Sequence, residues 1–138
     1  MSSTSDVDDF EPVYTVPDWY DGPRGGIASF RGTPHIYRCL VDYGPIEFYW
    51  VQPIDQETFA LALEEWDIWL RWDAAFRVGA VAIETHPALP EDRARYDELQ
   101  AILPARLVLD PSRSIQVRAE WGDGPLTTRR VRWTPVEG

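Results

Sequence analysis

The hydrophobic pattern of this chain predicts one long helix over residues 55–78. Two lines of apolar side chains run along opposite sides of it: Phe59, Leu63, Trp66 and Leu70 on one, and Leu61, Ile68, Trp72 and Phe76 on the other. Between them lies a narrow polar wedge with Glu64, Asp67 and Arg71. Because one layer of neighbours covers one line, we expect this helix to be covered on more than one side, by its own domain or by a partner.

Local signals place both ends of this helix. Asp55 is a good N-cap, because its carboxylate accepts a hydrogen bond from an amide of the first turn. Gly79 is suited to the left-handed conformation that commonly ends a helix. Asp73 precedes Arg77 by four residues, and an acid placed four residues before a base stabilises a helix.

Alternating or β-branched segments predict strands on both sides of the long helix. The expected strands are residues 13–16, 27–30, 35–43, 46–52, 114–121 and 126–133, and a second helix is expected over 90–103. Pro104 should end or kink this second helix. The order β-β-β-β-α-α-β-β lacks strand-helix-strand alternation, so it predicts an α+β fold. We expect an antiparallel sheet of about five or six strands, with the two helices packed on one face.

The domain organisation is expected to be simple. Residues 1–12 are small, polar and acidic, so we expect them to form a disordered tail. Residues 13–138 then form a single α+β domain, a length that can bury a core without disulfides or metal.

Charge and cysteine content narrow the function classes. The net charge is −10, and residues 1–104 carry 19 acids against 7 arginines. The negative electrostatic potential of such a surface disfavours binding to nucleic acid and anionic membranes and favours a basic protein partner. The lone Cys39 cannot form an internal disulfide, no apolar run could span a membrane, and the first residues do not resemble a signal peptide. We therefore expect a soluble, cytoplasmic protein.

Catalytic and metal-binding motifs are missing from the sequence. It has no HExxH, GxSxG, Walker or dinucleotide-binding pattern, and its two histidines and one cysteine do not have the spacing of a zinc site. No metal and no cofactor is therefore expected, and the sequence favours a protein that is not an enzyme.

The aromatic helix supplies the candidate partner-binding residues: Glu65, Trp69, Trp72, Asp73 and Phe76. Tryptophan is enriched in binding hot spots, and acids near it would attract a basic partner. The leading hypothesis is a small acidic intracellular protein-binding domain, such as an immunity- or antitoxin-like inhibitor or regulator of a toxin or nuclease. A homodimer formed through the same helix is a further option. Burial of Trp69 and Trp72 inside the chain's own core is the alternative to both.

A second hypothesis is an enzyme or a small-ligand-binding protein. The loop over residues 21–26 is rich in glycine and resembles a phosphate loop, but it lacks the lysine and helix that follow such a loop. In this hypothesis an anion binds near the loop, with Asp21, Arg24, His35 and His86 as the candidate catalytic or binding residues.

Overall fold

The chain has the expected α+β element order, and the six antiparallel strands close into a barrel. The structure, a computed structural model, describes residues 10–19, 23–43, 46–122 and 129–136. Two compact units can be distinguished, Met1–Asp55 with Leu109–Gly138, and Gln56–Val108. We call them the barrel unit and the helical unit. That the helices pack on the sheet within a single domain stays a prediction.

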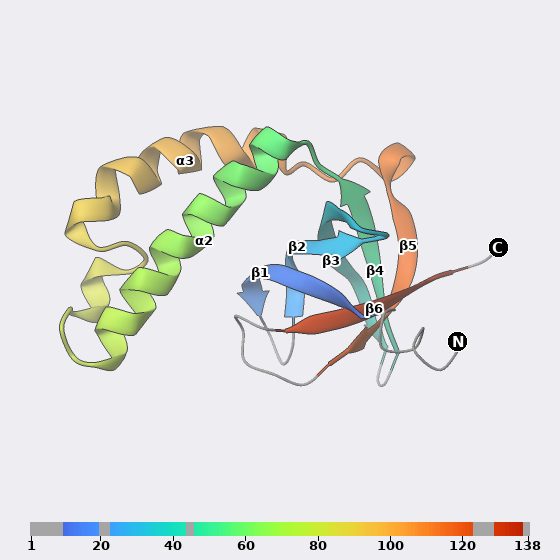
Figure 1. Ribbon diagram of the computed structural model, residues 1–138, viewed down its shortest axis with the longest axis horizontal. Helices are drawn as coiled ribbons and strands as arrows, with labels where there is room; N and C mark the ends of the chain where they lie inside the picture. Colours follow the sequence, from blue (N-terminus) through green and yellow to red (C-terminus); the bar gives the residue numbers. More distant parts are fainter. Residues whose placement is uncertain (1–9, 20–22, 44–45, 123–128, 137–138) are drawn as a thin grey trace. The chain divides into compact units, whose positions relative to one another are not determined.

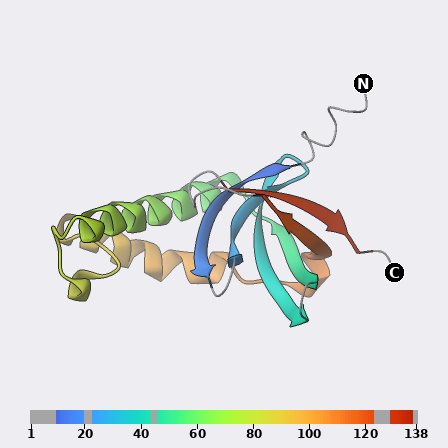
Figure 2. The same ribbon diagram turned by 90° about the horizontal axis from the view of Figure 1, so that it is seen from below.

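The barrel unit contains every strand, and each strand pairs with its neighbours in antiparallel fashion (Figures 1 and 2). The strands are β1 (Glu11–Trp19), β2 (Pro23–Phe30), β3 (Thr33–Tyr43), β4 (Ile46–Pro53), β5 (Ile115–Trp121) and β6 (Arg130–Pro135). A short 3-10 helix, η4 (Pro111–Arg113), precedes β5. The expected strand at 126–133 starts later, at Arg130, and residues 123–128 lie outside the described part of the chain.

Aromatic side chains from four strands pack together in the barrel core. The rings of Tyr37, Tyr49, Trp121 and Trp133 contact one another at centroid distances between 5.6 and 6.1 Å. The Tyr37 hydroxyl donates to the carbonyl of Thr15 at 3.0 Å, and the Tyr49 hydroxyl donates to a carbonyl of β2 at 2.6 Å. Each buried tyrosine thus pairs its polar end while its ring fills the core.

The first strand starts earlier than the sequence suggested. Glu11 and Pro12 were expected in a disordered tail, but they belong to β1 and pair with Val131 and Arg130 of β6. The Glu11 carboxylate also accepts a hydrogen bond from the Ser29 hydroxyl at 2.7 Å. This corrects the tail boundary; residues 1–9 lie outside the described residues.

The helical unit is a hairpin of two helices joined by two short 3-10 turns. Its elements are α2 (Gln56–Arg77), η2 (Ile83–Thr85), η3 (Pro90–Asp92) and α3 (Arg93–Arg106). The second helix therefore starts and ends later than the expected 90–103. Pro104 does not end α3, because a proline removes only its own hydrogen bond, and the amide of Leu107 still donates to Leu103 at 3.0 Å.

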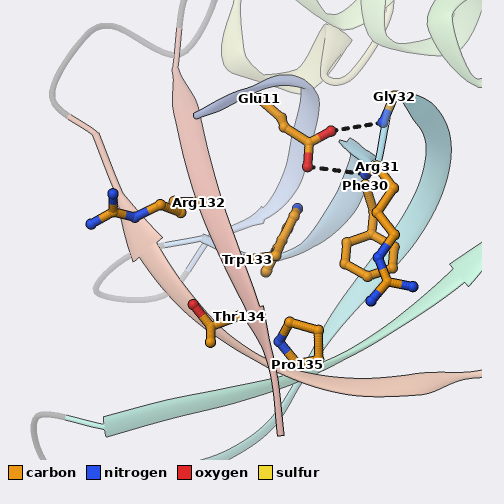
Figure 3. A pocket seen from close by; sticks show the side chains of 8 residues that line it. All are labelled: Glu11, Phe30, Arg31, Gly32, Arg132, Trp133, Thr134 and Pro135. Atoms are coloured by element: carbon orange, nitrogen blue, oxygen red, sulfur yellow. Dashed lines mark hydrogen bonds between the residues drawn. The ribbon is translucent and has the colours of Figure 1, made fainter. Parts of the chain in front are cut away.

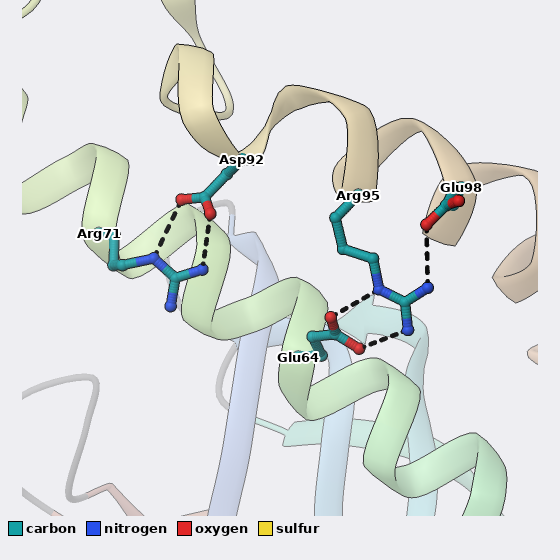
Figure 4. Close-up of polar contacts among 5 residues, drawn as sticks. All are labelled: Glu64, Arg71, Asp92, Arg95 and Glu98. Carbon is teal, nitrogen blue, oxygen red and sulfur yellow. Dashed lines mark hydrogen bonds and ion pairs between the residues drawn. The ribbon is translucent and has the colours of Figure 1, made fainter.

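A row of charged residues on α2, spaced seven residues apart, forms ion pairs with α3, and Figure 4 shows two of them. Glu64 accepts two hydrogen bonds from Arg95, and Arg71 donates two to Asp92. One repeat earlier, Glu57 pairs with Arg106 of α3 at 3.0 Å. Glu64 and Arg71 of the polar wedge therefore join the two helices, because α3 presents charges of opposite sign opposite them.

The apolar stripe of α2 also differs from the one expected. The buried residues of this helix are Thr58, Ala62, Trp66, Ile68 and Trp72. Trp66 belongs to the first expected line, while Ile68 and Trp72 belong to the second. With apolar residues on most sides of the helix, periodicity could not identify the buried face.

Candidate functional site

The end of the helical hairpin where α2 leads into its connection is organised around Trp72, which is 3% exposed. Its indole nitrogen donates to the Thr85 hydroxyl at 2.7 Å. Its ring stacks on Phe76 at a centroid distance of 5.0 Å and meets the edge of His86 at 4.6 Å. Trp72 is therefore a core residue of the helical unit, which corrects its assignment to the partner-binding set.

The other candidates on α2 lie in different surroundings. Trp69 is half-buried and stacks on Trp66 at a centroid distance of 5.1 Å. The Glu65 carboxylate accepts a hydrogen bond from the side-chain amide of Gln100, and burial raises its pKa. Asp73 pairs with the helix's own Arg77 at 2.8 Å. The roles of Trp69, Glu65 and Asp73 in partner binding stay predictions.

Three large apolar side chains are exposed where α2 gives way to the connection toward α3. Phe76 is 40% exposed, Val78 is 79% exposed and Ile83 is 55% exposed. We call Phe76, Val78 and Ile83 the tip cluster; the connection that carries Val78 and Ile83 forms one end of the hairpin in Figures 1 and 2. Sequence reasoning selected Phe76 and missed the other two. The signal was present, since they flank the predicted helix stop at Gly79.

Backbone hydrogen bonds hold the tip in a defined conformation. Gly79 has a φ of 75°, its amide donates to Phe76, and the amide of Ala80 donates to Ala75. These two bonds form the Schellman motif that glycine favours at helix ends. From α3, the Arg93 guanidinium donates to the carbonyl of Thr85 at 3.2 Å, so the connection is tied to both helices.

Two acids near the tip have no basic partner among the residues that the structure describes. Glu84 lies beside Ile83, and Glu91 lies in η3; both are exposed and form no ion pair within the described residues. By contrast, Asp92 pairs with Arg71 at 3.0 Å. The tip therefore combines an apolar cluster with negative charge that remains available to a partner.

The residues of the second hypothesis do not converge in the described structure. Asp21 lies outside the described residues, and His86 belongs to the helical unit. The Arg24 guanidinium donates to the Cys39 sulfur at 3.6 Å. On β3, Cys39 lies four residues from His35. That distance is about 13 Å at ~3.3 Å per residue, so Arg24 and His35 do not share a site.

His35 is a buried residue that packs inside the barrel unit. It is 7% exposed, its Nδ1 lies 2.9 Å from the carbonyl of Thr33, and its ring packs against the edge of Phe30. Burial lowers its pKa, because the charged imidazolium loses solvation there. We therefore find no support for His35 as an anion-binding residue.

The barrel unit carries a hollow of about 570 Å³, which we call the barrel groove (Figure 3). Its lining consists of Glu11, Phe30, Arg31, Gly32, Arg132, Trp133, Thr134 and Pro135. At one side the Glu11 carboxylate accepts hydrogen bonds from the amides of Arg31 and Gly32, both at 3.0 Å. Burial acts to raise the pKa of Glu11, but the bonds from Ser29, Gly32 and Arg31 outweigh it and hold the pKa below its ordinary value.

In the part of the chain that the structure describes, no three histidine, cysteine, aspartate or glutamate side chains gather in a way that could hold a metal ion. None of the described helices has the length and apolar character needed to cross a bilayer.

Comparison with known proteins gives no relative: no family model, no curated protein and no solved structure matches this chain.

Proposed function

We propose that this chain is a small acidic protein-binding domain that binds a basic polypeptide through the tip of its helical hairpin. The observation that carries the proposal is the tip cluster, in which Phe76, Val78 and Ile83 are 40%, 79% and 55% exposed within eight residues. Soluble proteins seldom leave adjacent large apolar side chains in water without an interaction that uses them.

The tip is also prepared for binding. The Trp72 ring stacks on Phe76, and the hydrogen bonds made by Gly79 and Arg93 hold the connection between α2 and α3 in place. A surface that is already ordered loses less conformational entropy when it binds, so more of the contact energy appears as affinity.

Charge supports a basic partner. Residues 56–108 carry ten acids against five arginines, and Glu84 and Glu91 are unpaired among the described residues. A negative surface speeds encounter with a basic protein, so association should slow as salt is added. An inhibitor or regulator of a basic toxin or nuclease in the cytoplasm is the class of protein that fits this proposal.

The direct test is affinity capture from the native host with wild-type protein and with Val78→Ser/Ile83→Ser. Both side chains are largely exposed, so we expect the variant to fold normally and to lose the partner. Ile115→Ser is the matched control, because Ile115 is 39% exposed but lies on β5, and it should retain the partner. If the tip variant captures everything that the wild type does, the proposal is wrong. A dimer that dissociates in the tip variant, measured by sedimentation, would show that the partner is a second copy.

A further inference from the structure

The turn between β2 and β3 places its first residue in a backbone conformation that strains an arginine. The turn consists of Arg31 and Gly32, and Phe30 pairs with Thr33 across it. Both turn residues have positive φ values, 55° at Arg31 and 85° at Gly32. Two-residue hairpin turns of this kind favour asparagine, aspartate or glycine at the first position, because longer L side chains are strained there. An arginine therefore stands where asparagine would form the same turn with less strain.

The Glu11 carboxylate holds this strained turn in place. It accepts hydrogen bonds from the amides of Arg31 and Gly32, both at 3.0 Å, and from the Ser29 hydroxyl at 2.7 Å. Backbone strain persists only where surrounding contacts fix it, and strained residues are concentrated at functional sites. Because these bonds involve only the backbone of the turn, they do not explain why its first side chain is an arginine.

The Arg31 side chain lines the barrel groove. Its guanidinium lies over the Phe30 ring at 4.7 Å, and Figure 3 shows the two side chains together. Among the residues that the structure describes, no carboxylate forms an ion pair with Arg31. Contact with the ring restricts the orientation of the guanidinium, so less conformational freedom is lost when it binds a ligand.

The groove has the size and composition of a small-molecule site. Its volume of about 570 Å³ lies within the range of about 300–1,000 Å³ that is common for ligand pockets. Phe30 and Trp133 are 3% and 8% exposed, so their rings are held by the barrel core and form a rigid apolar floor. Pro135, which is exposed, adds an apolar wall. An apolar surface beside a few fixed polar groups is the usual lining of such sites.

The charges of the lining residues favour a ligand with one negative charge. Arg31 supplies a planar guanidinium, which suits two parallel hydrogen bonds to a carboxylate. Arg132, also in the lining, pairs with Glu120. Hydrogen bonds hold the pKa of Glu11 below its ordinary value, so this carboxylate stays ionised at neutral pH. A second negative charge on the ligand would therefore be repelled by Glu11.

We propose that the barrel groove binds a small monocarboxylate with a flat apolar body. The carboxylate pairs with the Arg31 guanidinium, and the apolar body lies against Trp133 and Pro135. This role explains the arginine in a turn that asparagine would form with less strain. The site belongs to the barrel unit and is independent of the tip cluster, so either proposal can fail without the other.

NMR titration of the full chain with naphthalene-2-carboxylate tests the proposal. We expect shifts of the Arg31 and Gly32 amide signals and of the Trp133 indole signal. The neutral naphthalene-2-carboxamide should bind at least about tenfold more weakly, because it lacks the charge that Arg31 pairs with. The doubly charged naphthyl phosphate should also bind more weakly, because of Glu11. Equal binding of the carboxamide, tighter binding of the phosphate, or no shift at these signals up to the solubility limit would overturn the proposal.

The variant Arg31→Asn separates binding from folding. It should weaken binding of naphthalene-2-carboxylate at least about tenfold and unfold at or above the wild-type temperature, since Asn-Gly is favoured in this turn. Arg113→Asn is the matched control, because Arg113 is exposed in η4 and does not line the groove, and it should bind as the wild type does. Unchanged affinity in Arg31→Asn would overturn the proposal. A lower unfolding temperature would also overturn it, because the arginine would then be explained by its contact with Phe30.

Discussion

The indole nitrogen of Trp72 and the hydroxyl of Thr85 form a 2.7 Å hydrogen bond that joins α2 to the connection following it. The same hydroxyl donates to the carbonyl of Ala82 at 2.6 Å. Thr85 thus links the aromatic core of the hairpin to the backbone that carries the tip cluster. The tip is shaped by this pair, although neither residue belongs to the cluster itself.

Replacing Thr85 with alanine should destabilise the hairpin. The buried indole nitrogen of Trp72 would lose its acceptor, which costs about 1–3 kcal/mol of unfolding free energy. Chemical denaturation followed by tryptophan fluorescence measures the change. Thr134→Ala, at an exposed position of β6, is the control and should stay within about 0.5 kcal/mol of wild type. Equal stability of the two variants would show that the Trp72–Thr85 bond contributes little.

Gly26→Ala should be strongly destabilising, because β1 and β2 approach closely there. An added Cβ would lie 2.2 Å from the carbonyl oxygen of Thr15 and 2.9 Å from the Tyr37 hydroxyl. Backbone atoms must move to accept it, so we expect a loss of about 2 kcal/mol or more. The neighbouring Gly25→Ala is the control, because its Cβ would meet nothing closer than 3.5 Å. Thermal unfolding compares the two, and similar melting temperatures would contradict this packing.

Glu11→Gln should lower stability at neutral pH and matter less in acid. The folded state holds the pKa of Glu11 below its ordinary value of 4.5. Its stabilisation is therefore fully present above pH 4.5 and is lost as the pH falls through the lower pKa of the folded protein. Denaturation of wild type and variant at a series of pH values should give curves that converge in acid. A constant difference at every pH would show that the charge of Glu11 is not the cause.

The ion pairs between α2 and α3 should contribute modestly. Arg71 is 52% exposed in its pair with Asp92, so solvent screens the interaction. A double-mutant cycle with Arg71→Ala and Asp92→Ala should give a coupling energy below about 1 kcal/mol, which decreases as salt is added. The same cycle for Asp67 and Arg71 is the control and should give less, because Arg71 donates its hydrogen bonds to Asp92. A coupling that is insensitive to salt would contradict an exposed pair.

Short-range signals predicted the long helix well. The helix expected over 55–78 is observed as Gln56–Arg77, and Gly79 has the positive φ that was predicted for it. The Asp73–Arg77 pair also forms. Each of these features depends on residues within about one helical turn of one another, so the sequence carries enough information to predict them.

Features that depend on distant residues were predicted less well. The ion pairs of Glu64 with Arg95 and of Arg71 with Asp92 were not predicted, because nothing near Glu64 and Arg71 in sequence shows which charges would lie opposite them. The barrel groove was missed for the same reason, since it joins Glu11 and Arg31 to the end of β6. Of the candidate binding residues, Phe76 is exposed and Trp72 is core, although both lie on the same apolar line of the helix.

The sequence by itself determined the α+β class, the order of the elements, the ends of the long helix and the acidic charge, because local periodicity, capping residues and composition express these directly. The tertiary structure decided that the six strands close into a barrel, which side of α2 is buried, and which aromatic residues remain in water. Those outcomes depend on contacts between residues far apart in the chain. Their free energies depend on geometry that exists only once the elements have come together.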